Sequence, residues 1–214
     1  MVIDEDQISG LLRKPSEALQ VEVKTWLDPR VDADIAKLVK AIFAIRNRNG
    51  GYLILGLNNT TMQPDSYALD KGVGVLFHID AIQGLVSRFA SEAFEVVVAL
   101  RERDGQVHPV IVVPEGVRVP AVVKRDLRGE GGKVLLREGD VYFRTLQSNG
   151  TPSSARLAPS DYAEMLEICF ENREADIGRF LRRHLSGLGS AVPALFEAAL
   201  DDPAKRLRDR AFAT

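Results

Sequence analysis

The chain has 214 residues, of which 45% are hydrophobic, so it can form one principal domain with a small appendage. Its 28 basic and 30 acidic residues give a formal net charge of −2, which excludes a globally basic nucleic-acid binder and leaves only local charge segregation. The single cysteine, Cys169, excludes an internal disulfide and fits a reducing, cytoplasmic setting. No segment approaches the roughly 20 apolar residues of a membrane span, so we expect a cytoplasmic protein outside the membrane.

The N-terminal part of the chain predicts a short helix followed by a strand, a long helix and a second strand. In "LQVEVKTWL" (residues 19–27) the alternation places Val21 and Val23 on the core face and turns Glu22 and Lys24 away from it. Residues 32–51 have helical periodicity, with Asp32 as the expected N-cap and Gly50 as the expected C-cap. The apolar run at residues 51–57 is typical of a strand buried on both faces, so we expect a crossover unit.

Further along the chain, residues 58–77 predict a surface loop and residues 78–90 a helix. Two β-branched runs around Asp104 and Gly105 predict a hairpin, and strands are expected within residues 119–126 and 141–145. Beyond Pro159 the pattern becomes helical, with Ser160 as the expected cap. We therefore predict an α+β domain over residues 1–158, with a mixed sheet flanked by helices, and a helical extension over residues 159–214 that is either packed on this domain or used in assembly.

Basic residues concentrate between Arg118 and Arg156, a segment that contains eight arginines and lysines and only four acidic residues. The glycine-rich segment "KRDLRGEGGK" (residues 124–133) suits either a flexible loop that contacts phosphates or an ordinary solvated hairpin tip. The residues expected to bind nucleic acid are Arg46, Arg48, Lys124, Arg125, Arg128, Lys133, Arg137 and Arg144.

Three segments, taken in chain order, resemble the Schlafen-type AlbA-2 domain, a family long described as DNA-binding. They are "SEALQVEVK" (residues 16–24), "AIFAIRNRNGGYLILGLNN" (residues 41–59) and "VYFRTLQSNGTPSSA" (residues 141–155), which frame about residues 10–160. The resemblance implies an α/β domain with a mixed sheet, often found in bacterial proteins as a nucleic-acid-binding or regulatory module.

The resemblance also implies a carboxylate site, because some Schlafen relatives cleave RNA with three acidic residues and a divalent metal. Carried over, two of these are Glu17 and Glu22, which would be the catalytic and metal-binding residues together with Lys24, with Mg²⁺ or Mn²⁺ as the cofactor. The third position holds Asn58 or Asn59, and an amide oxygen brings no charge to a hard cation. Alternatively, Glu17 and Glu22 are solvated side chains, with Glu22 paired to Lys24 or to Arg46 or Arg48.

These observations favour a non-catalytic module that binds DNA or structured RNA through the backbone with little sequence specificity. The degenerate carboxylate set argues against an enzyme. Two alternatives remain: a metal-dependent endoribonuclease centred on Glu17 and Glu22, and a regulatory scaffold that forms a homodimer or larger homo-oligomer through residues 159–214.

Overall fold

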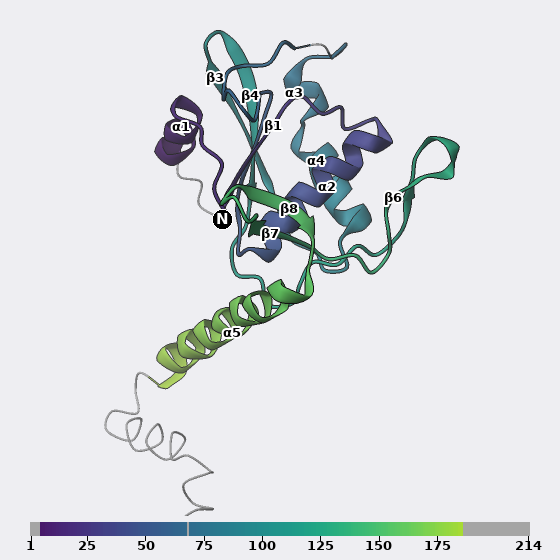
Figure 1. The fold of residues 1–214 in the computed structure, drawn as a ribbon. Coiled ribbons are helices and arrows are strands. Elements are labelled where there is room, and N and C mark those ends of the chain that lie inside the picture. Colours follow the sequence, from purple (N-terminus) through teal and green to yellow (C-terminus); the bar gives the residue numbers. More distant parts are fainter. Residues whose placement is uncertain (1–4, 68, 186–214) are drawn as a thin grey trace, which may run out of the picture. The chain divides into compact units, whose positions relative to one another are not determined.

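The computed structural model describes residues 5–67 and 69–185 (Figure 1). The chain divides into two compact units, residues 1–172 and 173–214. The division lies inside the last helix, α5 (Tyr162–Leu185), rather than before it. Among the described helices, none combines the length and hydropathy required to cross a bilayer.

A mixed four-stranded sheet forms the centre of the first unit, with strand order β1-β2-β4-β3. Strands β1 (Val21–Lys24) and β2 (Gly51–Leu55) are parallel and are joined by helix α2 (Asp32–Asn47), which confirms the predicted crossover. Strands β3 (Val97–Arg103) and β4 (Gln106–Val113) form the predicted hairpin, with Asp104 and Gly105 at φ 53° and 77° in its tight turn. The α+β class is therefore confirmed.

Helices cover both faces of this sheet. Helix α2 and helix α4 (Ile79–Phe89) pack on one face, where the core includes Leu53, Leu55 and Ile111. Helix α1 (Glu5–Arg13) covers the other face, where Ile8 and Leu12 pack with alternate strand residues. Figure 1 shows α1 on the opposite side of the strands from α2 and α4. The burial of Val21 and Val23 follows the predicted alternation.

Helix α2 differs from the sequence prediction at its start. The N-cap is Val31, whose side chain makes no capping bond, while the expected cap Asp32 is already helical. Asp34 helps to hold the entry loop, because its Oδ2 accepts a hydrogen bond from the Asp28 amide at 3.0 Å. At the other end Gly50 adopts φ 87°, and a Cβ there would lie 2.7 Å from the Glu115 nitrogen, so this position requires glycine.

Two small antiparallel ribbons follow the sheet in the chain. Strands β5 (Leu127–Arg128) and β6 (Val134–Leu136) form the first, and a short 3-10 helix (Glu130–Gly132) closes its tip. Strands β7 (Tyr142–Leu146) and β8 (Pro152–Arg156) form the second. The strand predicted within residues 119–126 is wrong, because this segment makes only isolated bridges, Ala90 to Val123 and Val122 to Val141.

The predicted loop at residues 58–77 contains one short helix, α3 (Val73–Leu76). Before α5, residues Pro159–Asp161 form a 3-10 helix, and the hydroxyl of the expected cap Ser160 donates to Asp161 Oδ1 instead. Within α5, Met165 and Cys169 are buried in the first unit, and Cys169 is a free thiol as expected.

Candidate functional site

The outer edge of strand β1 is closed by side chains and by a local backbone bridge to Ala18 rather than by another strand. The amide of Val23 donates to Glu17 Oε1 at 3.3 Å, and the amide of Val21 donates to the Ala18 carbonyl at 3.2 Å. The Val21 carbonyl accepts from Arg144 Nη2 at 2.7 Å. Glu17 therefore takes the place that a neighbouring strand would occupy, which is one way in which proteins protect an exposed edge.

Glu22 is buried, which corrects the prediction that it points away from the core. Its side chain is 1% exposed, and both carboxylate oxygens are engaged. Lys24 Nζ lies 2.8 Å from Oε1, while Arg144 Nη1 at 2.9 Å and the Ser154 hydroxyl at 2.6 Å contact Oε2. The physical reason is that the β7-β8 ribbon covers this end of β1, so the strand is buried on both faces.

Arg144 is the partner that sequence reasoning missed. It is predicted to bind nucleic acid, but its side chain is 1% exposed, and its guanidinium bonds to Glu22, Ser154 and the carbonyls of Ala18 and Val21. A residue in this position cannot contact a partner at the surface. Because Arg144 follows Val21 by 123 residues, no local pattern in the sequence signals the pairing.

The carboxylate cluster does not fit a divalent metal. A cation at Glu22 would displace Lys24 or Arg144 and leave one of them next to a metal of like charge, which is unfavourable in a buried site. Among the described residues, no group of three or more acidic, histidine or cysteine side chains could hold a metal ion. Asn58 does not complete the set, because its Oδ1 accepts from the amides of Thr60 and Thr61 and closes a turn.

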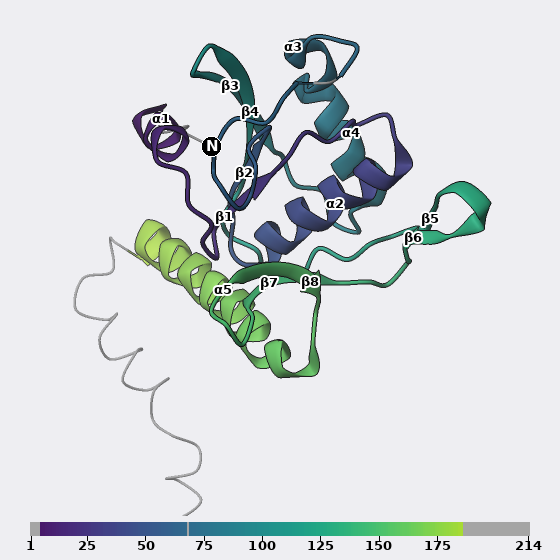
Figure 2. The same cartoon turned by 45° about the horizontal axis from the view of Figure 1, so that its top comes forward.

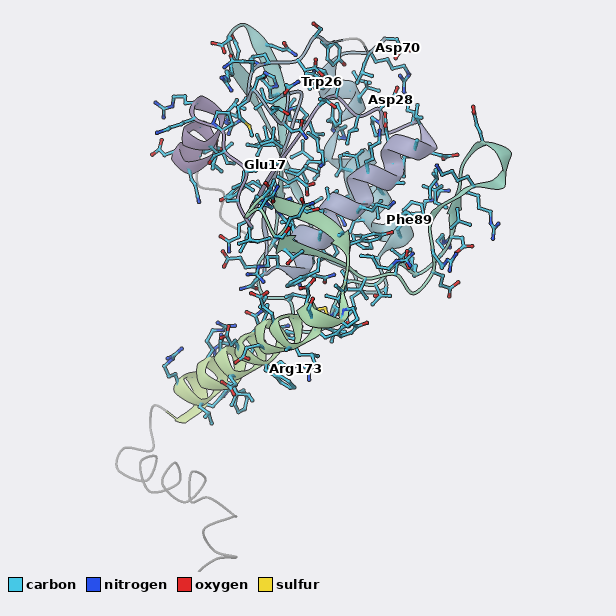
Figure 3. The ribbon with its side chains drawn as sticks, viewed as in Figure 1. Glu17, Trp26, Asp28, Asp70, Phe89 and Arg173 are labelled. Atoms are coloured by element: carbon cyan, nitrogen blue, oxygen red, sulfur yellow. The ribbon has the colours of Figure 1, made fainter. Side chains whose placement is uncertain are left out.

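A second polar cluster joins the segment after β1 to the long loop. Arg30 contacts both Asp28 and Asp70, and the hydrogen bonds from its guanidinium hold the pKa of each carboxyl below its usual range. Figure 3 shows Trp26, Asp28 and Asp70 toward one end of the molecule, away from Glu17. These acids therefore supply no third ligand beside Glu17 and Glu22.

Two of the arginines expected at a nucleic-acid interface are instead tied to the protein. Arg46 Nη1 donates to the Pro114 and Glu115 carbonyls at 2.8 and 2.7 Å, and burial lowers its pKa. Arg48 lies 2.5 Å from Glu164 with its guanidinium over the Phe143 ring, and it is 15% exposed. These contacts assign both side chains to the internal structure rather than to an open basic surface.

The other expected basic residues gather on one projecting feature, which we call the basic arm and define as residues 124–138. Figure 2 shows the β5-β6 ribbon extending away from α2 and the sheet. The arm carries five basic and three acidic residues. Lys124 contacts the Ser87 carbonyl and Arg128 pairs with Asp126 at 3.0 Å. In the described structure Arg125, Lys133 and Arg137 are exposed and form no ion pair.

One cation near the arm was not identified from the sequence. Lys40, on α2, lies over the Tyr142 ring with Nζ 5.6 Å from its centroid. Burial lowers the pKa of Lys40, and the nearby charges of Arg156 and Lys133 act in the same direction. The buried Asp140 organises this area, because it accepts bonds from the Tyr142 hydroxyl and from Arg156 at 3.1 and 2.9 Å. Helical periodicity alone gave no reason to single out Lys40.

Comparison with known proteins shows weak structural likeness. No protein-family model and no curated protein matches the chain. The DIP2311 protein of Corynebacterium diphtheriae matches at 16% identity and TM-score 0.47, over 75% of this chain but 27% of that one. The N-terminal domain of a RecG-related candidate ATP-dependent DNA helicase from Nitrosomonas europaea matches at 22% identity and TM-score 0.36, over 67% of this chain and 93% of that domain. The chain thus spans about a quarter of the DIP2311 protein.

Proposed function

We propose that this chain is a nucleic-acid-binding module that holds the phosphate backbone of DNA or structured RNA with its basic arm. The observation that carries the proposal is the presence of Arg125, Lys133 and Arg137 on the arm as exposed cations that form no ion pair with any residue in the described part of the chain. Cations that are already free of protein carboxylates neutralise phosphates without first breaking an internal pair, and each neutralised phosphate releases condensed counterions.

The shape of the arm supports backbone contact rather than base reading. Its tip contains Gly131 and Gly132 at φ 64° and 75°, so no bulky side chain fills the turn between the two strands. Basic side chains from both sides of the tip can therefore follow a curved phosphate backbone. The arm presents no exposed aromatic residue for stacking on bases, which is why we expect little sequence specificity.

The proposal is tested by filter binding of a 20-base-pair DNA duplex and an RNA hairpin. We expect affinity at about 50 mM salt that weakens steeply by about 200 mM. The triple variant Arg125→Ala, Lys133→Ala, Arg137→Ala should bind both probes more weakly. Its slope of log affinity against log salt should be shallower by about 1 for each phosphate that the variant no longer neutralises.

A matched triple variant controls for total charge. Lys14→Ala, Lys37→Ala and Lys71→Ala remove three exposed cations that lie outside the arm, so affinity and salt slope should stay near those of the parent. Absence of binding by the parent at about 50 mM salt would refute the function. Equal reductions of affinity in the two triple variants would show that overall charge, and not the arm, determines binding.

A further inference from the structure

Helix α5 presents a regular row of side chains that the fold leaves exposed. Leu166, Phe170, Ile177 and Phe180 are 46, 59, 59 and 60% exposed. Together with Arg173 and His184 they are spaced alternately four and three residues apart, which is the spacing of a coiled-coil seam. We call this row the α5 stripe, and it consists of Leu166, Phe170, Arg173, Ile177, Phe180 and His184.

The stripe is distinct from the part of α5 that is buried in the first unit. Met165 and Cys169 are 4 and 6% exposed. Each comes directly before a stripe residue in the sequence, Leu166 and Phe170 respectively. Asn172 donates to Asn49 and to the Val117 carbonyl at 2.9 and 2.8 Å. The helix therefore has one set of positions that stabilises its own unit and a separate apolar set, and large exposed apolar rows commonly mark protein contacts.

When a second copy of the stripe is aligned in the opposite direction, every stripe residue of one copy faces a stripe residue of the other. When two copies run antiparallel about Ala175, Phe170 of one faces Phe180 of the other, Leu166 faces His184, and Arg173 faces Ile177. Each pairing then occurs twice, related by a two-fold axis, as a symmetric dimer requires. In a parallel pair the same registers would place Arg173 against Arg173 and His184 against His184.

Charge along α5 selects the same orientation. The first eleven residues contain Glu164, Glu167 and Glu171 and no basic residue, while residues 177–185 contain Arg179, Arg182 and Arg183 and no acidic residue. Antiparallel pairing brings each acidic half near the basic half of the other copy, and parallel pairing brings like charges together. The helix dipoles add to this preference.

We propose that the α5 stripe binds the α5 stripe of a second copy of this chain, so that the protein forms an antiparallel, two-fold-symmetric helix pair. Arg173 near the centre then lies within a turn of Glu174 and Asp176 of the second copy. The pairing buries four apolar positions from each copy. Self-association through the stripe is independent of nucleic-acid binding by the arm.

The oligomeric state is tested by light scattering on the full chain at about 100 µM. We expect a mass near twice the 23.6 kDa of one chain. The variant Phe170→Glu, Phe180→Glu should be a monomer with an unchanged circular dichroism spectrum, because both side chains are exposed. The control Ala175→Glu adds charge on α5 outside the stripe and should remain a dimer. A parent chain that is monomeric overturns the proposal. This holds even if a variant that lacks residues 186–214 forms a dimer.

Orientation is tested by disulfide formation in a Cys169→Ser background. Phe170→Cys and Phe180→Cys proteins, one with a larger tag, are oxidised separately and as a mixture. Antiparallel pairing predicts a cross-link only in the mixture, between the two different chains. Cross-linked homodimers in each separate sample would indicate parallel pairing and overturn the proposal.

Charge exchange gives an independent readout. Glu167→Lys, Glu171→Lys makes both halves of α5 basic, and Arg179→Glu, Arg183→Glu makes both halves acidic. The homodimer of each variant should have a dissociation constant at least tenfold higher than that of the parent dimer. A mixture of the two variants should form a heterodimer. Unchanged self-association of both variants would exclude the proposed arrangement of charge.

Discussion

At the scale of single residues, the contacts of Glu22 explain how the fold stabilises a buried carboxylate. A carboxylate that is 1% exposed is stable only when donors replace the lost water, and Lys24, Arg144 and Ser154 provide them. Arg144 in turn has four protein acceptors. Removal of one member of such a pair leaves an uncompensated buried charge, which costs more than the pair itself contributes.

We therefore predict that Glu22→Gln lowers the free energy of unfolding by about 3–5 kcal/mol, measured by urea denaturation. The reason is that Arg144 stays buried without its carboxylate. As a control, Lys37→Met breaks an exposed pair with Asp34 and should cost less than about 1 kcal/mol. A destabilisation by Glu22→Gln as small as that of the control would contradict the buried-pair account.

The double variant Glu22→Leu, Arg144→Met tests the same pair without leaving a buried charge. We predict that it is more stable than Arg144→Met alone, because both ionic partners are replaced by apolar groups of similar size. The coupling between the two sites is obtained from the four-member cycle of parent, single and double variants. Simple additivity of the two single effects would show that the residues act independently.

His108 is the second residue whose environment has a measurable consequence. Its Nδ1 lies 3.0 Å from the Leu55 carbonyl, so this nitrogen carries the proton, and its buried Nε2 has no hydrogen-bond partner among residues 5–67 and 69–185. The ring also stacks on Trp26 at a centroid distance of 5.7 Å. Burial lowers the pKa of His108 below its ordinary value of 6.5, because protonation would place a charge on a ring that is removed from water.

This arrangement predicts a decrease of stability as the pH falls below about 6.5. Below that pH the unfolded chain binds a proton at His108 that the folded chain does not, so the free energy of unfolding decreases by up to about 1.4 kcal/mol per pH unit. His108→Asn keeps a donor for the Leu55 carbonyl and removes the titration. Urea denaturation between pH 5 and pH 7.5 should show a shallower dependence in this variant, and equal slopes would exclude His108 as the cause.

Residue positions were predictable where only local alternation mattered. Val21 and Val23 are buried as predicted, but the same alternation placed Glu22 outside. A period of two tells which residues share a face and does not tell whether a distant element covers the opposite face. Here that element is the β7-β8 ribbon, which packs on β1 through the side chains of Arg144 and Ser154, and no short segment encodes these contacts.

At the scale of elements, the passage from β2 into the long loop depends on a glycine. Gly56 has φ 84°, and a Cβ there would lie 2.3 Å from an indole carbon of Trp26. Trp26 itself donates to the Asp65 carbonyl at 3.0 Å and packs edge-on against Tyr67. The absence of a side chain at residue 56 therefore lets the indole lie against the strand end and join it to the loop.

We predict that Gly56→Ala lowers the free energy of unfolding by about 2 kcal/mol or more, because it combines left-handed strain with overpacking. Gly84→Ala is the matched control, since Gly84 lies inside α4 and a Cβ there meets nothing within 4 Å. That substitution should stabilise the protein by about 0.5–1 kcal/mol. Thermal unfolding of both variants gives the comparison, and a neutral Gly56→Ala would contradict the packing argument.

Elements with a strong local signal were predicted well. The α2 crossover and the β3-β4 hairpin follow from helical periodicity and from the Asp104-Gly105 turn. Residues 119–126 were predicted wrongly. Their β-branched composition suits a strand, but their actual partners allow only single bridges at Val122 and Val123. Strand propensity describes a side chain that fits a pleated surface and cannot supply a partner strand.

At the scale of the whole molecule, the boundary between the two units falls within α5 at residue 172. The first turns of this helix contribute Met165, Cys169 and Asn172 to the first unit. The sequence predicted a helical extension from residue 159, either packed on the preceding domain or used in assembly, because the composition changes at Pro159. Composition marks where helical residues begin and carries no information about which of them pack on the preceding domain.

Truncation tests the stability of the first unit. We predict that a chain ending at residue 176 unfolds cooperatively with nearly the midpoint in urea of the monomeric Phe170→Glu, Phe180→Glu variant, because it retains the buried residues of α5. A chain ending at residue 161 lacks Met165 and Cys169 and should be less stable by at least about 2 kcal/mol. Equal midpoints for the two truncated chains would show that α5 does not stabilise the first unit.

The closure of the β1 edge also fixes an order of events during synthesis. Residues 17–24 leave the ribosome before Arg144, which bonds to the Val21 carbonyl and is translated 123 residues after Val21. Until then the edge lacks the contacts of Arg144, although the amide and carbonyl of Val21 can already pair locally with Ala18, and strand edges that are left open pair with other chains. Glu17, only six residues before Val23, can satisfy the amide of Val23 early. It therefore acts locally during the interval in which the long-range contact does not yet exist.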